Sequence, residues 1–202
     1  MKLTLCPWIA LLLTLATIPA RGQLAPATGS DESGQIVIRG RATPYRIRRL
    51  PVLSFPTLPP VIAFELTRRG CLIPQTWQAH RPENVIQASL ERAGSSDWAA
   101  LCSAQGTVSL LVFFASAPEQ PLVLDTAAES ERLQAHGVNG ELGFDWGIDP
   151  ASPARIREAQ AGLEHRPPLL DHDALADSRL EHGTRYRFFL HNRWTLLEMP
   201  NN

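Results

Sequence analysis

Lysine is almost absent from this sequence: Lys2 is the only one in 202 residues. Every other basic side chain is an arginine or a histidine. Lysine Schiff bases, pyridoxal-phosphate attachment, the lysine of a phosphate-binding loop and serine–lysine dyads all need an amine. Because Lys2 lies at the start of an expected signal peptide, we expect none of these four kinds of site.

Other catalytic signatures are missing too. The sequence has no GxSxG nucleophile elbow, no GxGxxG after a strand, no phosphate-binding loop and no HExxH zinc motif. The net charge is −1, with acidic and basic residues mixed along the chain, so no overall positive field attracts a polyanion. We therefore expect no nucleic-acid partner and no cofactor, and we lean against an enzyme.

Long apolar runs occur only at the N-terminus. Lys2 is followed by an apolar run over residues 8–18 and then by small residues at Ala20 and Gly22, a pattern typical of a secretory signal peptide over residues 1–22. The run is shorter than the roughly 20 residues that a transmembrane helix needs. We expect an exported protein, periplasmic or secreted, with no transmembrane segment once the signal is removed.

The sequence has only three cysteines, and Cys6 lies within the expected signal peptide. The remaining two, Cys71 and Cys102, are too few for a four-cysteine zinc site. An oxidising compartment favours a disulfide between them over free buried thiols or a catalytic thiol. Closing a loop of this length is worth about 3–4 kcal/mol in the chain-entropy model.

Strand patterns dominate the rest of the chain. Residues 23–35 are small and polar and indicate a disordered lead-in, and residues 36–200 are enough for one domain. Residues 84–115 contain an alternating apolar segment, then "DWAALCS", then "TVSLLVFF", which predicts a three-strand antiparallel meander. The C-terminal segment predicts a hairpin that turns at His191 and Asn192.

Helix signals are few and short. Pro60 suits the first position of a helix that Gly70 ends, and Ser152 is a good N-cap for a second helix. Residues 127–137 are polar and weakly helical. We therefore predict an α+β domain: an antiparallel β-sheet, with a central three-strand meander plus a C-terminal hairpin, two or three short helices and one disulfide.

The segment 163–183, "LEHRPPLLDHDALADSRLEHG", holds the densest set of potential catalytic groups. Its candidate catalytic residues are Asp171, His172 and Asp173. Its candidate zinc ligands are the three histidines with acidic neighbours, His165, His172 and His182. The spacing matches no zinc motif, and the proline-rich segment reads as a flexible loop, so solvated turn residues are the simpler interpretation.

Candidate binding residues lie elsewhere. Residues 39–50, "RGRATPYRIRRL", carry five arginines and no acid, which is typical either of a surface for an anionic partner or of a solvated edge strand. An exposed patch that combines some of these arginines with a tryptophan would be a place for a ligand to bind. We take as candidates Arg46, Arg48, Trp77 and Trp194.

Two resemblances bear on the fold. The turn "ERAGSSDWA" is similar to the calcium-binding turns of FG-GAP and VCBS propeller repeats, but it keeps only Asp97 and occurs once, which argues against a propeller and a calcium site. In order, the blocks "RGCLIPQ", "NVIQASLERAGSSDWAALCS", "SLLVFF", "DHDALAD" and "YRFFLHNRW" resemble a family of uncharacterised exported bacterial proteins. That resemblance implies a single domain and does not point to any particular function.

These observations favour a non-catalytic periplasmic or secreted binding module, whose partner is an envelope protein or an anionic cell-surface polymer. The alternative is an exported hydrolase, with or without a metal ion, that uses the segment Asp171–His172–Asp173.

Overall fold

The computed structural model describes residues 29–161, 163, 166 and 169–198. The expected signal peptide and residues 23–28 lie outside this range. The elements in chain order are β1 (Ser30–Ile38), β2 (Arg41–Pro51), η1 (Val52–Ser54), α1 (Pro60–Arg68), β3 (Leu72–Gln75), β4 (Val85–Ala88), β5 (Asp97–Ala104), β6 (Thr107–Phe113), β7 (Leu122–Ala128), η2 (Glu129–Arg132), β8 (Leu133–His136), β9 (Glu141–Phe144), β10 (Trp146–Ala151), α2 (Pro153–Ala159), β11 (Ala174–Arg179), β12 (Gly183–Leu190) and β13 (Arg193–Glu198).

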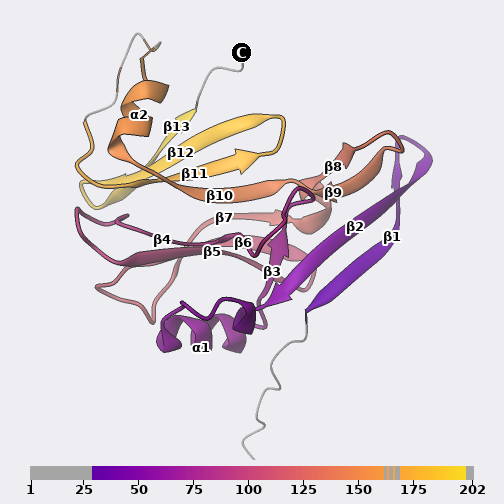
Figure 1. Cartoon of the computed structure of the whole chain (residues 1–202), viewed down its shortest axis with the longest axis horizontal. Coiled ribbons are helices and arrows are strands. Elements are labelled where there is room, and N and C mark those ends of the chain that lie inside the picture. Colours follow the sequence, from indigo (N-terminus) through magenta and orange to yellow (C-terminus); the bar gives the residue numbers. More distant parts are fainter. Residues whose placement is uncertain (1–28, 162, 164–165, 167–168, 199–202) are drawn as a thin grey trace, which may run out of the picture.

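The strands form two sheets. Sheet A has the order β7-β6-β5-β3-β2-β9-β8, with β1 also paired to β2 and β4 to β5, and sheet B has the order β10-β11-β12-β13. Figure 1 shows the two sheets stacked, with α1 under sheet A and α2 over sheet B. None of the helices in the described ranges is long and apolar enough to cross a membrane.

Strand β5 shows how the core is divided. Its residues alternate between two sides, as strand geometry requires. Ala99 and Leu101 join the core between the two sheets, whereas Trp98, Ala100 and Cys102 join the core between sheet A and α1. A third cluster lies between α2 and the outer face of sheet B. Both faces of sheet A are thus covered near β5, which explains the apolar character of the meander.

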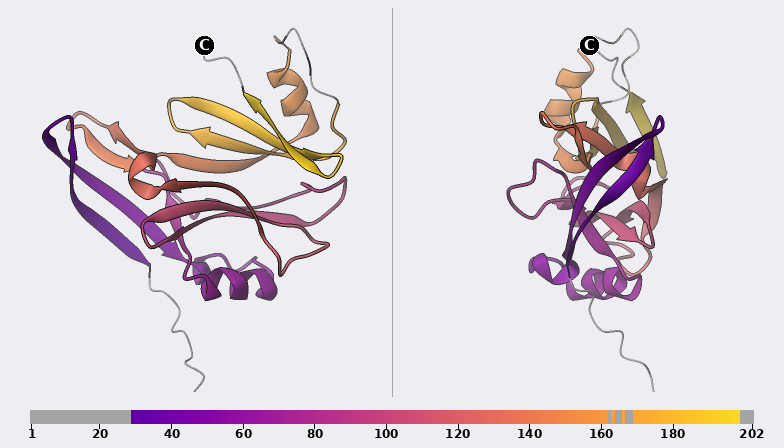
Figure 2. Two further views of the ribbon diagram at one scale, coloured as in Figure 1. Left: turned by 180° about the vertical axis from the view of Figure 1, so that it is seen from behind. Right: turned by 90° about the vertical axis from the view of Figure 1, so that its right-hand side faces the viewer.

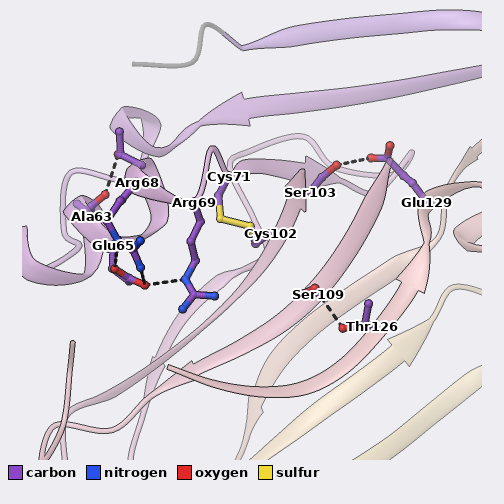
Figure 3. The surroundings of a disulfide bond; sticks show 11 residues. Ala63, Glu65, Arg68, Arg69, Cys71, Cys102, Ser103, Ser109, Thr126 and Glu129 are labelled. Atoms are coloured by element: carbon purple, nitrogen blue, oxygen red, sulfur yellow. Dashed lines mark hydrogen bonds and ion pairs between the residues drawn. A yellow bond between two sulfur atoms is a disulfide. The ribbon is translucent and has the colours of Figure 1, made fainter. Parts of the chain in front are cut away.

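The predicted disulfide is present. Cys71 and Cys102 are bonded, with their Cα atoms 4.9 Å apart (Figure 3). Helix α1 begins with Pro60 and is followed by Gly70 at φ +70°, a conformation that favours glycine after a helix. This turn directs Cys71 toward β5, so the disulfide joins a helix end to a strand.

Other local predictions are also confirmed. Strands β4, β5 and β6 form the antiparallel meander. The C-terminal hairpin turns at His191 and Asn192, both at positive φ, as a two-residue turn requires. The Ser152 side chain accepts a hydrogen bond from the Arg155 amide at the start of α2.

Three expectations about the sheet were wrong. The protein has two sheets, and sheet A is mixed because β2 and β9 run parallel. Residues 30–35, expected in the disordered lead-in, form the first part of β1, since pairing with β2 satisfies their backbone groups. Residues 127–137 contain a short 3₁₀ turn and β8 instead of a helix, because β8 gains a full ladder with β9.

A buried polar cluster connects the sheets. Asp177 on β11 accepts a 2.7 Å hydrogen bond from the indole of Trp146 and a 2.8 Å bond from Arg187. Arg187 also reaches Asp125 on β7 at 2.6 Å. Arg132 lies over the Trp146 ring, 3.9 Å from its centroid, and its burial lowers the pKa of the guanidinium. These contacts fix the β9–β10 connection, which borders the site described next.

Candidate functional site

The candidate hydrolase residues hold the sheets together. His172 is buried; its Nδ1 lies 2.8 Å from Asp171 Oδ1 and its Nε2 lies 2.8 Å from the Phe189 carbonyl oxygen. The hydrogen bond between Asp171 and His172 holds the pKa of the Asp171 carboxyl below its ordinary value. Asp173 accepts from the Ser89 amide at 3.0 Å, which ties sheet B to the end of β4. Both imidazole nitrogens are engaged, so His172 has no free nitrogen for a metal ion or a substrate.

The three histidines do not form a metal centre in this structure. The segment that we expected to be a flexible loop contains β11, whose six residues separate His172 from His182 by roughly 20 Å of strand. Zinc–nitrogen bonds are about 2 Å long, so these two rings cannot share an ion. His165 lies outside the described residues. Among the residues that are described, no three His, Cys, Asp or Glu side chains are placed to hold a metal ion.

Trp194 lies away from the other binding candidates. Its ring packs against Phe114 and Phe189, with centroids 6.1 Å and 5.6 Å apart, at the edge of the core between the sheets. Trp194 therefore contributes to packing between β13 and sheet A.

The remaining three candidates line one pocket. Arg46 and Arg48 on β2 lie beside Trp77, in the loop after β3. We call this site the Trp77 pocket; it measures about 260 Å³ and is lined by Arg46, Arg48, Gln75, Thr76, Trp77, Ala79, His136 and Glu141. Ligand pockets span roughly 300–1,000 Å³, so its size suits one small ring or a single sugar unit.

The pocket forms where two strand ends meet. On one side of β2, the antiparallel partner β3 covers Arg48 to Pro51 and the parallel partner β9 covers Tyr45 and Arg46. The two partners therefore end facing each other, and the Trp77 amide donates to the Phe144 carbonyl at 3.0 Å. From this point the chains leave in different directions, which opens a hollow on the sheet face.

Alternation along β2 gives the pocket its charge. Ile47 and Arg49 point to the covered face, so Arg46 and Arg48 point to the opposite one. Arg46 is exposed and pairs with Asp31 at 2.8 Å. Arg48 is half-buried and donates only to the Ala79 carbonyl, at 3.2 Å, with no carboxylate of the described chain within ion-pair distance. The other N–H groups of its guanidinium have no partner among the described residues, and Arg48 lines the pocket.

Trp77 and His136 form the aromatic wall. Their rings are parallel within 2°, with centroids 4.6 Å apart. Gly143 on β9 lies beneath them, and a Cβ atom there would come within 2.5 Å of the Trp77 Cβ. The missing side chain is what lets the tryptophan approach the sheet.

The loop that carries Trp77 is fastened at both ends. Gln75 exchanges two hydrogen bonds with the backbone of Glu83, and the Glu83 carboxylate accepts from the Thr76 amide at 2.7 Å. Asn84, buried at φ +68°, donates to the Pro74 and Trp146 carbonyls and accepts from the Ile148 amide. These bonds hold the pocket in shape without a ligand.

Sequence reasoning missed His136, which lies in a segment that we expected to be helical. His136 faces Glu141 across the β8–β9 hairpin. The glycines in "HGVNGE", at positions 137 and 140, both adopt positive φ and were the signal for a turn between strands.

Two other hollows are polar. The first, between the 76–84 loop and the β11–β12 turn, includes Glu83, Asp149 and Glu181. The second includes Arg49 and Glu129, an ion pair buried between β2 and η2, with Ser103 donating to Glu129 at 2.8 Å (Figure 3). In the second hollow the charged groups satisfy one another, so neither is left to bind a ligand.

Comparison of the chain with protein-family models, with curated proteins and with solved structures returned no match.

Proposed function

We propose that this protein is an exported, non-catalytic binding module that holds an anionic sugar unit of a cell-surface polymer in the Trp77 pocket. The observation that carries the proposal is Arg48, a half-buried residue that lines a preformed pocket and whose guanidinium makes one hydrogen bond within the described chain. Arginine offers a planar fork that matches a carboxylate, and a carboxylate pairs with it more strongly in a partly desolvated site than in open water.

The other lining groups support a sugar. An aromatic ring presents a flat apolar surface to a pyranose face, and Trp77, stacked on His136 on one side, lines the pocket. The Glu141 carboxylate, which also lines the pocket, adds acceptors for hydroxyl groups.

Export is supported by two features. The N-terminal sequence predicts a signal peptide, and the Cys71–Cys102 disulfide is compatible with an oxidising compartment. The absence of recognisable catalytic motifs in the sequence favours binding without turnover. The hydrolase alternative gains no support from Asp171, His172 and Asp173, since their contacts are structural.

A titration with D-glucuronate tests the proposal, with D-glucose as its neutral counterpart and arginine side-chain NMR signals as the readout. We expect saturable binding of glucuronate, little binding of glucose, and at least a roughly ten-fold loss of affinity in Arg48→Gln, equivalent to about 1.4 kcal/mol. Arg41→Gln is the control, because Arg41 is on the same strand and outside the pocket.

Three outcomes would overturn the proposal. They are no glucuronate binding by the wild type, equal binding by Arg48→Gln, and binding of an acidic peptide in place of glucuronate. The last would indicate an envelope protein as the partner.

A further inference from the structure

Strand β1 is an open edge of sheet A. It pairs with β2 over its whole length, and no other strand of the described chain lies along its second side. In Figures 1 and 2 the β1–β2 hairpin extends beyond the rest of sheet A. An edge of this length presents a row of backbone donors and acceptors that another strand can pair with.

The geometry of the β1–β2 hairpin shows which backbone N–H and C=O groups of β1 are not bonded to β2. Arg39 and Gly40 form its two-residue turn, both at positive φ, so Ile38 and Arg41 are the closing hydrogen-bonded pair. Even-numbered residues of β1 therefore bond to β2. The odd-numbered residues direct their backbone N–H and C=O groups outward, and these are Asp31, Ser33, Gln35 and Val37.

The usual protection against edge pairing is missing along much of this strand. Natural edges carry charges, prolines or bulges that discourage association. Residues 33–38, "SGQIVI", contain no charged residue and no proline. Val37 is 71% exposed and Ile38 is 42% exposed, on opposite faces of the ribbon. An edge with these features favours a partner strand over solvent.

Charge identifies that partner as a second copy of the chain. The acidic residues Asp31 and Glu32 lie at the base of β1, and Arg39 lies at its tip. Asp31 pairs with Arg46 of its own hairpin, but its side chain remains 49% exposed. Antiparallel pairing of two β1 strands places the base of each beside the tip of the other, so opposite charges meet twice. A two-fold dimer needs this kind of self-complementary surface.

We propose that the protein forms a two-fold dimer through antiparallel pairing of β1 with β1 of a second copy. The two-fold axis passes between Gln35 and the Gln35 of the second copy. Ser33 then lies opposite Val37 of the second copy, and Asp31 lies opposite its Arg39. This register matches the outward-facing backbone groups of both strands and joins the two copies of sheet A into one continuous sheet.

The dimer has a consequence that rests on the proposed function, although the dimer itself does not. A two-fold axis through antiparallel edge strands runs perpendicular to the joined sheet. The face that carries Arg46 and Arg48 then points to the same side in both copies. Two Trp77 pockets on one side suit a polymer with repeating anionic units, because the second contact becomes intramolecular.

Sedimentation velocity of the disulfide-intact protein, without ligand and over a range of concentrations, tests the dimer. We expect a monomer–dimer equilibrium in the wild type and a monomer in Gln35→Pro, which removes an outward N–H at the centre. Amide hydrogen exchange locates the interface: Ser33, Gln35 and Val37 should become protected as the dimer forms. A wild type that stays monomeric, or a dimer that leaves these amides unprotected, would overturn the proposal.

Charge reversal provides a rescue test. Asp31→Arg and Arg39→Asp should each weaken the dimer by roughly ten-fold, because each change converts two attractive cross-strand pairs into repulsive ones. The double variant should restore dimerisation. Arg41→Asp is the matched control, since it makes the same charge change on β2. Failure of the double variant to recover would show that Asp31 and Arg39 do not meet.

Discussion

The ring of Trp77 lies parallel to the ring of His136, with an interplanar angle of 2° and a centroid separation of 4.6 Å. The two residues are far apart in the sequence and come from a loop and from strand β8. Gly143 of strand β9 lies directly against both side chains. The aromatic wall of the Trp77 pocket therefore depends on one glycine.

Gly143→Ala should disrupt this stack. The new Cβ would lie 2.5 Å from the Trp77 Cβ and 2.9 Å from the His136 ring, so the loop must move, at a cost of about 1–3 kcal/mol. We expect a changed near-ultraviolet circular dichroism spectrum and loss of glucuronate binding. Gly147→Ala is the control, because its Cβ would meet only Thr76, at 3.6 Å. Unchanged spectra and binding in Gly143→Ala would contradict the role of this contact.

The ionisation of Glu65 should make the free energy of unfolding depend on pH. This buried carboxylate accepts hydrogen bonds from Arg68 and Arg69 at 2.7–2.8 Å, and the bond from Arg68 contributes most to lowering the pKa of Glu65 to about 2. A lowered pKa stabilises the folded state at pH values above 4.5, the ordinary pKa of a glutamate. This contribution is lost as the pH falls toward 2.

Glu65→Gln should therefore be less stable than the wild type at neutral pH, by about 1–2 kcal/mol because the two arginines are partly exposed. The difference should shrink between about pH 4.5 and pH 2, as measured by urea denaturation at each pH. Glu119→Gln, at an exposed site, should show no such trend. A constant difference across this range would refute the assignment.

The disulfide should contribute most of its effect through the unfolded chain. It closes a loop with a sequence separation of 31 residues, worth about 3–4 kcal/mol in the chain-entropy model. Reduction should lower the free energy of unfolding by about this amount, while a Cys71→Ala/Cys102→Ala variant should not respond to reductant. Equal stability of the oxidised and reduced wild type would count against this account.

Asp97 should act as a structural anchor. It is fully buried, and its carboxylate accepts from the Leu90, Glu91 and Ala115 amides and from the Ser95 hydroxyl. Asp97→Ala leaves these amides without their acceptor, so we expect a loss of about 3 kcal/mol or more in urea denaturation. Because donors surround both oxygens, calcium should not change the melting temperature. A calcium-dependent increase would show that a cation binds there.

Local sequence signals predicted the parts of the fold that depend on neighbours in the chain. Pro60 and Gly70 marked the ends of α1, and His191–Asn192 marked the C-terminal turn. The alternation in residues 84–115 predicted the meander because a half-buried strand has a period of two residues. The pairing of Cys71 with Cys102 followed from the number of cysteines outside the expected signal peptide.

The candidate site was predicted only in part. Arg46, Arg48 and Trp77 were selected as the side chains suited to an anion and a ring, and the structure brings them together. Trp194 was grouped with them on the same grounds but packs in the core, since a tryptophan suits either place. His172 was selected for its acidic neighbours, but Asp171 and the Phe189 carbonyl hold the buried ring in place, and Asp173 binds the Ser89 amide instead.

The sequence by itself determined the type and ends of several elements and predicted the disulfide, because these depend on residue identity and short-range geometry. The tertiary structure alone decided that β2 and β9 run parallel, that β3 and β9 meet end to end, and that β1 is left with an open side. Strand partners are chosen by the total burial and hydrogen bonding of the sheet, which no short segment contains. The Trp77 pocket and the proposed dimer edge both arise from that choice.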